Sequence, residues 1–220
     1  MVKAVIVDVD DTLCLTEAAS FALENDVLAR MGRPPMSRAV HLSTWGEVLL
    51  DAMPHRSPGL DLDRFAALFP IAHQEYLADG RLDVIPPENL AALDRFVLAG
   101  RTVMLLSSRT EVEIEHLLAA DHVLAGRVTG AYHQGNSRFR KPDPRAFDEL
   151  LAETGLAPGD CVYVGDSPGD AVAAGGAGIR FIACLQSGVR RLDEFDPIHV
   201  TAAVETFPEI VDVIEAWDGA

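Results

Sequence analysis

The chain has few basic residues, few cysteines and no long apolar run. Its 18 lysines and arginines are outnumbered by 34 aspartates and glutamates, which gives a net charge of −16. Nucleic acids and anionic membranes bind basic surfaces, so neither is an expected partner. No apolar run approaches the ~20 residues that a membrane helix requires, and the first residues lack the pattern of a signal peptide. An anionic substrate would therefore need a local cationic group or a metal ion.

The cysteines give no sign of a disulfide framework or of a metal site. There are three, Cys14, Cys161 and Cys184, and no two of them show metal-ligand spacing. Reduced thiols in the cytoplasm are the simplest interpretation. Apolar residues make up 49% of the chain and charged residues 24%, as in ordinary globular proteins.

The later two thirds of the chain alternate between strand and helix patterns. This alternation predicts an α/β fold, a Rossmann-like doubly wound parallel sheet with helices on both faces. The expected strands are residues 4–7, 102–106, about 127–129, 161–164, 179–183 and about 199–204. The expected helices are residues 86–99, 110–120, 143–155, 168–174, closed by Gly175 and Gly176, and 207–217.

The segment between the first two strands differs from the rest. It predicts helices over residues 17–31, 37–53 and 61–79, the last broken or kinked at Pro70. About seventy helical residues between two strands indicate an inserted domain rather than a crossover. The prediction is a discontinuous core of residues 1–14 and 87–220 with an all-helical domain of residues 15–86.

The most informative segment is the first strand and the residues that follow it. Residues 4–7 are apolar, and Asp8, Asp10, Asp11 and Thr12 come soon after. Like charges crowded at a strand end are unfavourable unless a cation or a reacting group requires them. In open parallel sheets the ligand crevice lies at the carboxyl ends of the strands, where this cluster is expected.

Three other short stretches follow predicted strands in the same way. They are Ser107-Ser108, Lys141-Pro142, and residues 165–170 with Asp166 and Asp170. Carboxylates can hold Mg²⁺, and a hydroxyl and an ammonium can bind phosphoryl oxygens. One carboxylate can attack phosphorus while another donates and then removes a proton.

These four stretches, in this order, resemble the four motifs of the haloacid dehalogenase superfamily. The resemblance is to its phosphatase branch with an inserted helical cap, similar to phosphoglycolate phosphatase and β-phosphoglucomutase. It implies Asp8 as the nucleophile that forms an aspartyl-phosphate and Asp10 as the general acid and then the general base. It also implies phosphoryl binding by Ser107, Ser108 and Lys141, with Thr12 supporting the nucleophile loop.

The resemblance also implies Mg²⁺ held by Asp8, by the main-chain carbonyl of Asp10 and by Asp166. Asp170 either helps to hold the metal or orients Lys141. Dehalogenating members of the superfamily lack an acid at position 10, and phosphonate-cleaving members use a cap lysine, whereas this chain has only Lys3 and Lys141. Phosphate ester cleavage is therefore favoured. Many members carry glycine where this chain has Asp11, which we expect to face solvent or to cap the following turn.

Alternative functions remain at this point. A phosphosugar mutase would use the same residues and return the phosphoryl group to its substrate. A non-enzymatic phospho-acceptor module would keep it. The expected partner is a small phosphorylated metabolite, and the sequence predicts no oligomeric state.

The helical segment offers several cationic side chains that could bind a second anionic group of the substrate. For each of them alone, a role on the solvated surface is the more ordinary interpretation. They are Arg30, Arg33, Arg38, Arg56, Arg64, His41, His55 and His73. Arg109, Arg138 and Arg140 flank the phosphate loops without an assigned role.

Overall fold

The structure is a computed structural model in which residues 1–45, 47 and 49–219 are described. Its internal contacts divide the chain into two compact units. One unit combines Met1–Cys14 with Ile85–Ala220, and the other is Leu15–Val84.

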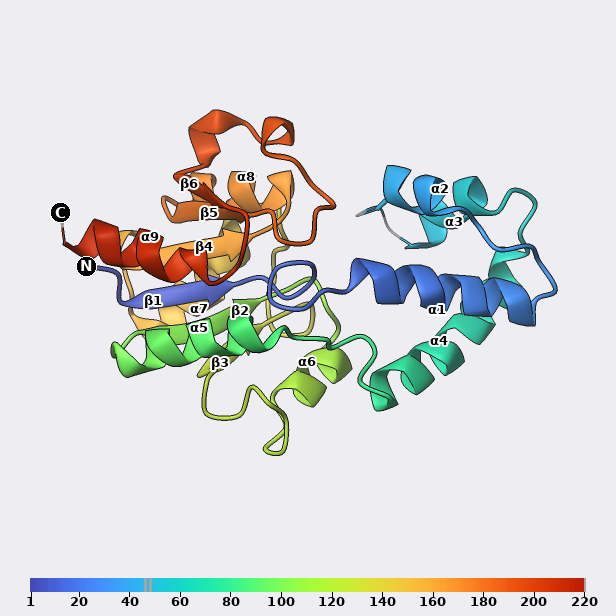
Figure 1. The fold of residues 1–220 in the computed structure, drawn as a ribbon, viewed down its shortest axis with the longest axis horizontal. Coiled ribbons are helices and arrows are strands. Elements are labelled where there is room, and N and C mark those ends of the chain that lie inside the picture. The colour runs from blue at the N-terminus through green and yellow to red at the C-terminus, as the bar shows by residue number, and fades with distance from the viewer. Residues whose placement is uncertain (46, 48, 220) are drawn as a thin grey trace. The chain divides into compact units, whose positions relative to one another are not determined.

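The first unit is built on a six-stranded sheet whose paired strands are all parallel (Figure 1). The strand order is β3-β2-β1-β4-β5-β6. From the central strand β1 the chain adds β2 and β3 on one side, and then β4, β5 and β6 on the other. This topology confirms the predicted doubly wound α/β fold. The strands are β1 (Ala4–Val7), β2 (Thr102–Leu106), β3 (Gly130–Tyr132), β4 (Cys161–Gly165), β5 (Arg180–Cys184) and β6 (Ala202–Val204).

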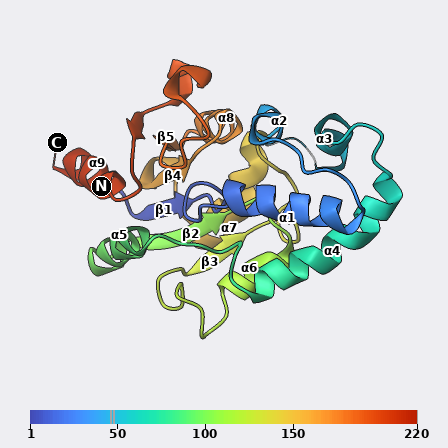
Figure 2. The same ribbon diagram turned by 45° about the vertical axis from the view of Figure 1, so that its right-hand side comes forward.

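Helices cover both faces of this sheet, as the fully buried strand β1 requires (Figure 2). Val5 and Val7 belong to the core that includes residues of α5 (Pro87–Leu98), α6 (Glu111–Leu117) and α9 (Glu209–Asp218). Ala4 and Ile6 belong to the opposite core, with α7 (Asp148–Thr154) and α8 (Pro168–Gly176). Burying one such aliphatic side chain contributes about 1.5–3 kcal/mol, so β1 is firmly anchored at the centre of the sheet.

The boundaries of several elements differ from the prediction. The third strand lies at Gly130–Tyr132 rather than at 127–129, and a 3₁₀ helix, η1 (Pro144–Phe147), precedes α7. Helix α8 continues through Gly175 and Gly176 instead of closing there. A β-carbon at Gly175 would lie 2.4 Å from His199 Nδ1, so glycine serves close packing here rather than helix termination. The remaining 3₁₀ helices are η2 (Pro158–Asp160), η3 (Leu192–Glu194) and η4 (Pro197–His199).

The helical unit contains α1 (Glu17–Arg30), α2 (Arg38–Ser43), α3 (Leu49–Arg56) and α4 (Leu62–Ala78). The single helix predicted over 37–53 is therefore wrong, and it falls into α2 and α3, with residues 46 and 48 outside the described part. Of the two possibilities predicted at Pro70, a break or a kink, the break is wrong, because α4 runs through this residue. Proline inside a helix costs about 3 kcal/mol, which burial of Phe65, Ala72 and Tyr76 in the unit's core offsets.

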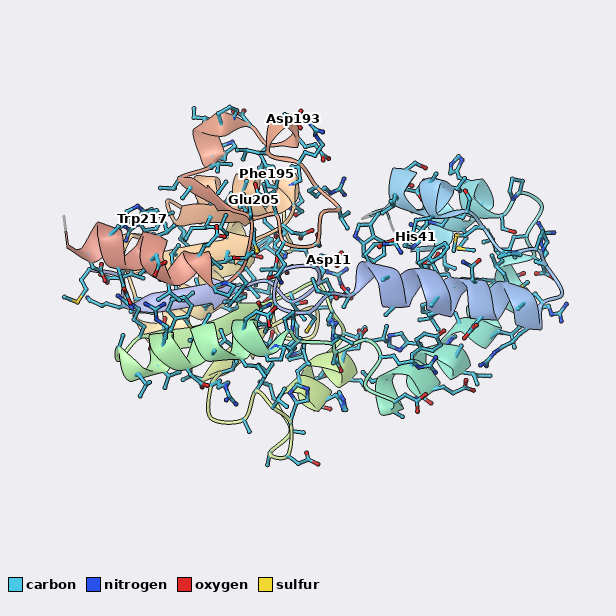
Figure 3. All side chains as sticks on the ribbon, in the orientation of Figure 1. Asp11, His41, Asp193, Phe195, Glu205 and Trp217 are labelled. Carbon is cyan, nitrogen blue, oxygen red and sulfur yellow. The ribbon has the colours of Figure 1, made fainter. Side chains whose placement is uncertain are left out.

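Charged side chains are buried inside this unit as well. His41, which Figure 3 labels, is fully buried, with its Nδ1 2.8 Å from Glu17 Oε1. Arg56 donates to both carboxylate oxygens of Glu24 at 2.7 Å. Arg38 pairs with Glu17 and Arg30 with Glu75. Several of the predicted specificity cations are therefore already committed to acids of their own unit.

No helix of the described chain is both long and apolar enough to cross a membrane. Cys14, Cys161 and Cys184 are all buried, and none forms a disulfide within the described part of the chain.

Candidate active site

The carboxyl ends of the central strands bring the predicted stretches together. Asp8 follows β1, and its N–H donates to Val164 O of β4 at 2.9 Å. Ser107 follows β2, and its N–H donates to Tyr132 O of β3 at 2.9 Å. The backbone hydrogen bonds of the sheet thus continue past the ends of β1 and β2 and fix the backbone of Asp8 and Ser107. β1 and β4 are also the point where the chain reverses its direction across the sheet, where ligands bind in this class of fold.

Lys141 is the cation at the centre of this cluster. Its Nζ lies 2.6 Å from Asp8 Oδ1 and 2.7 Å from Asp170 Oδ1. It also donates to the Tyr163 hydroxyl at 2.9 Å. Burial acts to lower the pKa of Lys141, but the charges of Asp170 and Asp8 outweigh it and hold that pKa well above its usual value. Lys141 is therefore a permanent positive charge in the site.

Three carboxylates surround this cation. Asp8, Asp166 and Asp170 are buried, and one oxygen of each lies within 4.8 Å of the others. Burial, with the repulsion of Asp170 and Asp10, outweighs the opposing attraction of Lys141 and raises the pKa of Asp8 to about 7. Burial and the charges of Asp8 and Asp170 raise the pKa of Asp166 well above its ordinary value.

This donor set fits a hard divalent cation. One lysine does not balance three buried carboxylates, and oxygen ligands are those that Mg²⁺ prefers. Both oxygens of Asp170, however, already have partners. Oδ2 accepts hydrogen bonds from the Ser167 N–H at 3.1 Å and hydroxyl at 2.7 Å, and Oδ1 contacts Lys141. Asp8 and Asp166 are thus better placed than Asp170 to turn an oxygen toward a metal.

Asp10 is held differently from Asp8. Its side chain is 40% exposed and pairs with the guanidinium of Arg109, with Arg109 Nη2 3.0 Å from Asp10 Oδ1. Asp10 therefore lies nearer to solvent than the buried cluster, although the two acids are two residues apart.

Ser107, Ser108 and Lys141 line one pocket. Ser107 is buried, whereas Ser108 is exposed. Thr12 is fully buried, and its hydroxyl has no hydrogen-bond partner among the residues that the structure describes. Its carbonyl accepts a bond from Gln186 Nε2 at 3.2 Å, which supports the loop after β1.

Asp11 corrects one expectation. It does not face solvent, since it is only 2% exposed (Figure 3). Its charge contributes to the raised pKa of Asp166. Its φ of 55° lies in the left-handed region, which L-residues other than asparagine and aspartate rarely adopt. The conformation explains why glycine suits this position.

Two functional residues were missed or left unassigned in the sequence. Tyr163 lies inside β4, and its hydroxyl donates to Asp170 Oδ1 at 3.0 Å. Burial, then the charge of Asp170, raises the pKa of Tyr163 well above 10, so the phenol stays protonated. A tyrosine within an apolar strand gives no signal that separates it from core packing. Arg109 was noticed but could not be paired with Asp10, which is 99 residues earlier.

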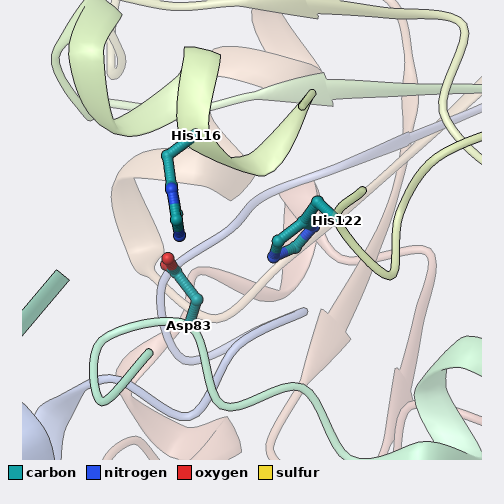
Figure 4. A group of neighbouring side chains, drawn as sticks. All are labelled: Asp83, His116 and His122. Carbon is teal, nitrogen blue, oxygen red and sulfur yellow. The ribbon is translucent and has the colours of Figure 1, made fainter. Parts of the chain in front are cut away.

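Two histidines outside the predicted motifs also lie close together. The rings of His116 and His122 pack edge to face with centroids 5.7 Å apart (Figure 4). Both belong to the segment around and after α6, and edge-to-face packing accounts for their proximity.

Comparison with protein families agrees with this geometry. The sequence model of the haloacid dehalogenase-like hydrolases matches residues 2–178. The chain belongs to the haloacid dehalogenase-like hydrolases. It is therefore an enzyme of the hydrolase class, and the family resemblance drawn from the four motifs is confirmed.

Relatives of this haloacid dehalogenase-like hydrolase include phosphatases. Phosphoglycolate phosphatase 1 of Pseudomonas aeruginosa is 26% identical over 82% of this chain and 68% of its own length. Protein CbbY of Rhodobacter capsulatus is 26% identical over 94% of this chain and 98% of its own. The structure of a mutant CbbY from Rhodobacter sphaeroides with xylulose-1,5-bisphosphate superposes with a TM-score of 0.73. That structure has 19% identity and covers 95% of this chain and 96% of that one.

Proposed function

We propose that this hydrolase cleaves a small phosphomonoester through an aspartyl-phosphate on Asp8, with Mg²⁺ as cofactor. The observation that carries the proposal is the buried contact between Asp8 and Lys141, at 2.6 Å, beside Asp166. A carboxylate held against an ammonium, in a cluster with an excess of negative charge, suits a site that takes up a metal ion and a phosphoryl group.

In the first half-reaction, an oxygen of Asp8 bonds to phosphorus. The bond from phosphorus to the ester oxygen breaks, and its electron pair stays on that oxygen. Asp10 in its acid form gives its proton to the same oxygen, which leaves as an alcohol. Lys141 and the Ser107 hydroxyl bind the non-bridging oxygens and stabilise the charge that develops there.

In the second half-reaction, a water oxygen bonds to phosphorus while Asp10 takes a proton from that water. The bond between phosphorus and Asp8 breaks, and its electron pair returns to the carboxylate. Phosphate is released, and both aspartates regain their starting states. Asp170 and Tyr163 keep Lys141 in place through contacts of 2.7 and 2.9 Å.

Mg²⁺ would be held by Asp8, Asp166 and the main-chain carbonyl of Asp10, and would supply Lewis-acid stabilisation of the phosphoryl oxygens. Asp170 is better suited to orienting Lys141 than to binding the metal, because both of its oxygens already have partners. The three buried cysteines form no disulfide within the described residues, which supports action in the cytoplasm.

The names of two relatives support a class of substrate. One is named a phosphoglycolate phosphatase, and another was solved with a ketopentose bisphosphate. We propose a small phosphorylated metabolite of this kind. The test is phosphate release from 2-phosphoglycolate, xylulose-1,5-bisphosphate and a panel of sugar phosphates, each with and without Mg²⁺. We expect Mg²⁺-dependent release from at least one of them.

Two other results of that screen would overturn the proposal. Isomerisation of a sugar phosphate without phosphate release would indicate a mutase. A stable phosphorylated protein with no release would indicate a phospho-acceptor module.

Metal binding should also change stability in a pH-dependent way. The pKa of Asp8 is raised from 3.8 to about 7 by burial. A carboxyl group with a raised pKa in the folded state contributes stability that is fully present below its unfolded pKa and is lost as the pH rises through 7. For Asp8 this loss is on the order of 4 kcal/mol over the full range.

We therefore expect Mg²⁺ to raise the melting temperature more at pH 8 than at pH 5. At 100 times its dissociation constant a bound ion contributes about 2.7 kcal/mol. Thermal unfolding in EDTA and in Mg²⁺ at both pH values measures the difference. Asp166→Asn should lose most of the Mg²⁺ effect. An Mg²⁺ shift of equal size at both pH values, or one that survives in this variant, would contradict the assignment.

A further inference from the structure

Arg109 is a buried cation whose role the chemistry above leaves open. Its side chain is 5% exposed, in a chain with almost twice as many acids as bases. It follows the phosphate loop directly, at the residue before the N-cap of α6. Its guanidinium pairs with Asp10.

Two neighbouring donors of the Arg109 guanidinium, which form a fork, both reach one oxygen of the Asp10 carboxylate, and one of them also reaches the other oxygen. Arg109 Nε lies 3.1 Å from Asp10 Oδ1 and 3.3 Å from Oδ2, and Nη2 lies 3.0 Å from Oδ1. Two donors on one rigid plane define the position of a carboxylate and also its orientation, which a lysine ammonium cannot do. The pairing therefore restricts the side-chain rotations of a half-exposed aspartate.

The backbone of Arg109 connects this fork to the phosphate loop. Its N–H donates to Ser107 Oγ at 3.1 Å. Since a hydroxyl has one proton to donate, an Oγ that accepts from Arg109 keeps that proton for another acceptor. The backbone of Arg109 thus leaves the Ser107 hydroxyl able to donate to a phosphoryl oxygen, while the side chain of Arg109 holds Asp10.

We propose that Arg109 is a positioning residue for the general acid and base, an inference that rests on the proposed phosphatase function. It holds the Asp10 carboxyl group where the ester oxygen leaves in the first half-reaction and where water enters in the second. A displacement of about 1 Å of such a group lowers a rate about 10²-fold. Arg109 does not itself contact the phosphoryl group.

The test compares leaving groups. An alkyl alcohol must be protonated as it leaves, whereas 4-nitrophenolate leaves readily without an acid. With the alkyl phosphate that the wild-type enzyme turns over fastest, Arg109→Gln should lower kcat/KM about 10²-fold, mainly through kcat. With 4-nitrophenyl phosphate, kcat/KM should change less than about threefold, because that step needs little acid catalysis.

Dephosphorylation gives a second measurement that needs only 4-nitrophenyl phosphate. Asp10 removes a proton from water in that step, so Arg109→Gln should keep a rapid burst of nitrophenolate and then turn over slowly. In an Asp10→Asn background the same substitution should have almost no further effect, because residues that act as one unit are not additive.

Arg109→Lys serves as a second variant in case the glutamine variant folds poorly. It keeps the charge and loses the fork, so we expect the same leaving-group dependence in a milder form. Arg95→Gln removes an exposed arginine that pairs with Glu215 and should change nothing. If Arg109→Gln lowered kcat/KM equally for both leaving groups, or only raised KM, Arg109 would be a substrate ligand. A faster variant would show that Arg109 restrains Asp10, and each result would overturn the proposal. An inactive wild-type enzyme would instead reject the proposed function.

Discussion

Replacing Asp8 with asparagine should abolish turnover. The amide is isosteric with the carboxylate but is a poor nucleophile, so the phosphoryl group has no acceptor. Loss of a nucleophile typically lowers kcat by several orders of magnitude, and we expect a fall on the order of 10⁴-fold or more. Steady-state phosphate release measures it. Acid-quenched mass spectrometry should detect one added phosphoryl group on wild-type protein and none on the variant.

The matched control is Asp160→Asn. Asp160 is 27% exposed, pairs with Lys3 and precedes β4 at the opposite end of the strand from Asp166. Its substitution should leave turnover unchanged. If Asp8→Asn retained more than about 1% of wild-type activity, a nucleophilic role for Asp8 would be excluded.

Replacing Lys141 with methionine should damage both activity and stability. Methionine is close in length but carries no charge, so Asp8 and Asp170 lose their shared cation. Breaking a buried ion pair by removing one partner costs about 3–5 kcal/mol. Loss of one donor that stabilises a transition state costs about 10²–10³-fold in kcat. The stability loss should be greater at pH 8 than at pH 5, because Asp8 can become neutral at the lower pH.

The chain offers its own control, since Lys3 is the only other lysine. Lys3 is 62% exposed and forms a surface ion pair with Asp160. Lys3→Met should change the free energy of unfolding by less than about 1 kcal/mol and leave kcat unchanged. Urea unfolding in EDTA at both pH values compares the two variants. A Lys141→Met protein as stable as Lys3→Met at pH 8 would contradict the account of the buried cluster.

The sequence predicted the sheet well because its strands are buried on both faces. Residues 4–7 and 102–106 are short apolar runs, which match β1 and β2 residue for residue. The glycines misled the prediction where their role was packing. Gly175 resembles a helix terminus in sequence, yet it is required by His199, a contact between residues that are distant along the chain.

The residues of the candidate site were predicted from the order and spacing of the motifs. The hydrogen bonds and ion pairs that connect these residues were not. Each acid or hydroxyl directly after a strand was recognisable, because parallel strands end at one edge. The sequence does not show which of these side chains form ion pairs or hydrogen bonds with one another. Asp10 with Arg109 and Tyr163 with Asp170 depend on side-chain directions that only the folded sheet defines.

The buried charges of the helical unit have a consequence for how the enzyme can change. Inside the unit His41 pairs with Glu17 and Arg56 pairs with Glu24, and the unit has an apolar core of its own. Random mutagenesis confined to solvent-exposed positions of Leu15–Val84 should therefore yield many folded variants. The surface of this unit can diverge while its buried charges and apolar core keep its fold.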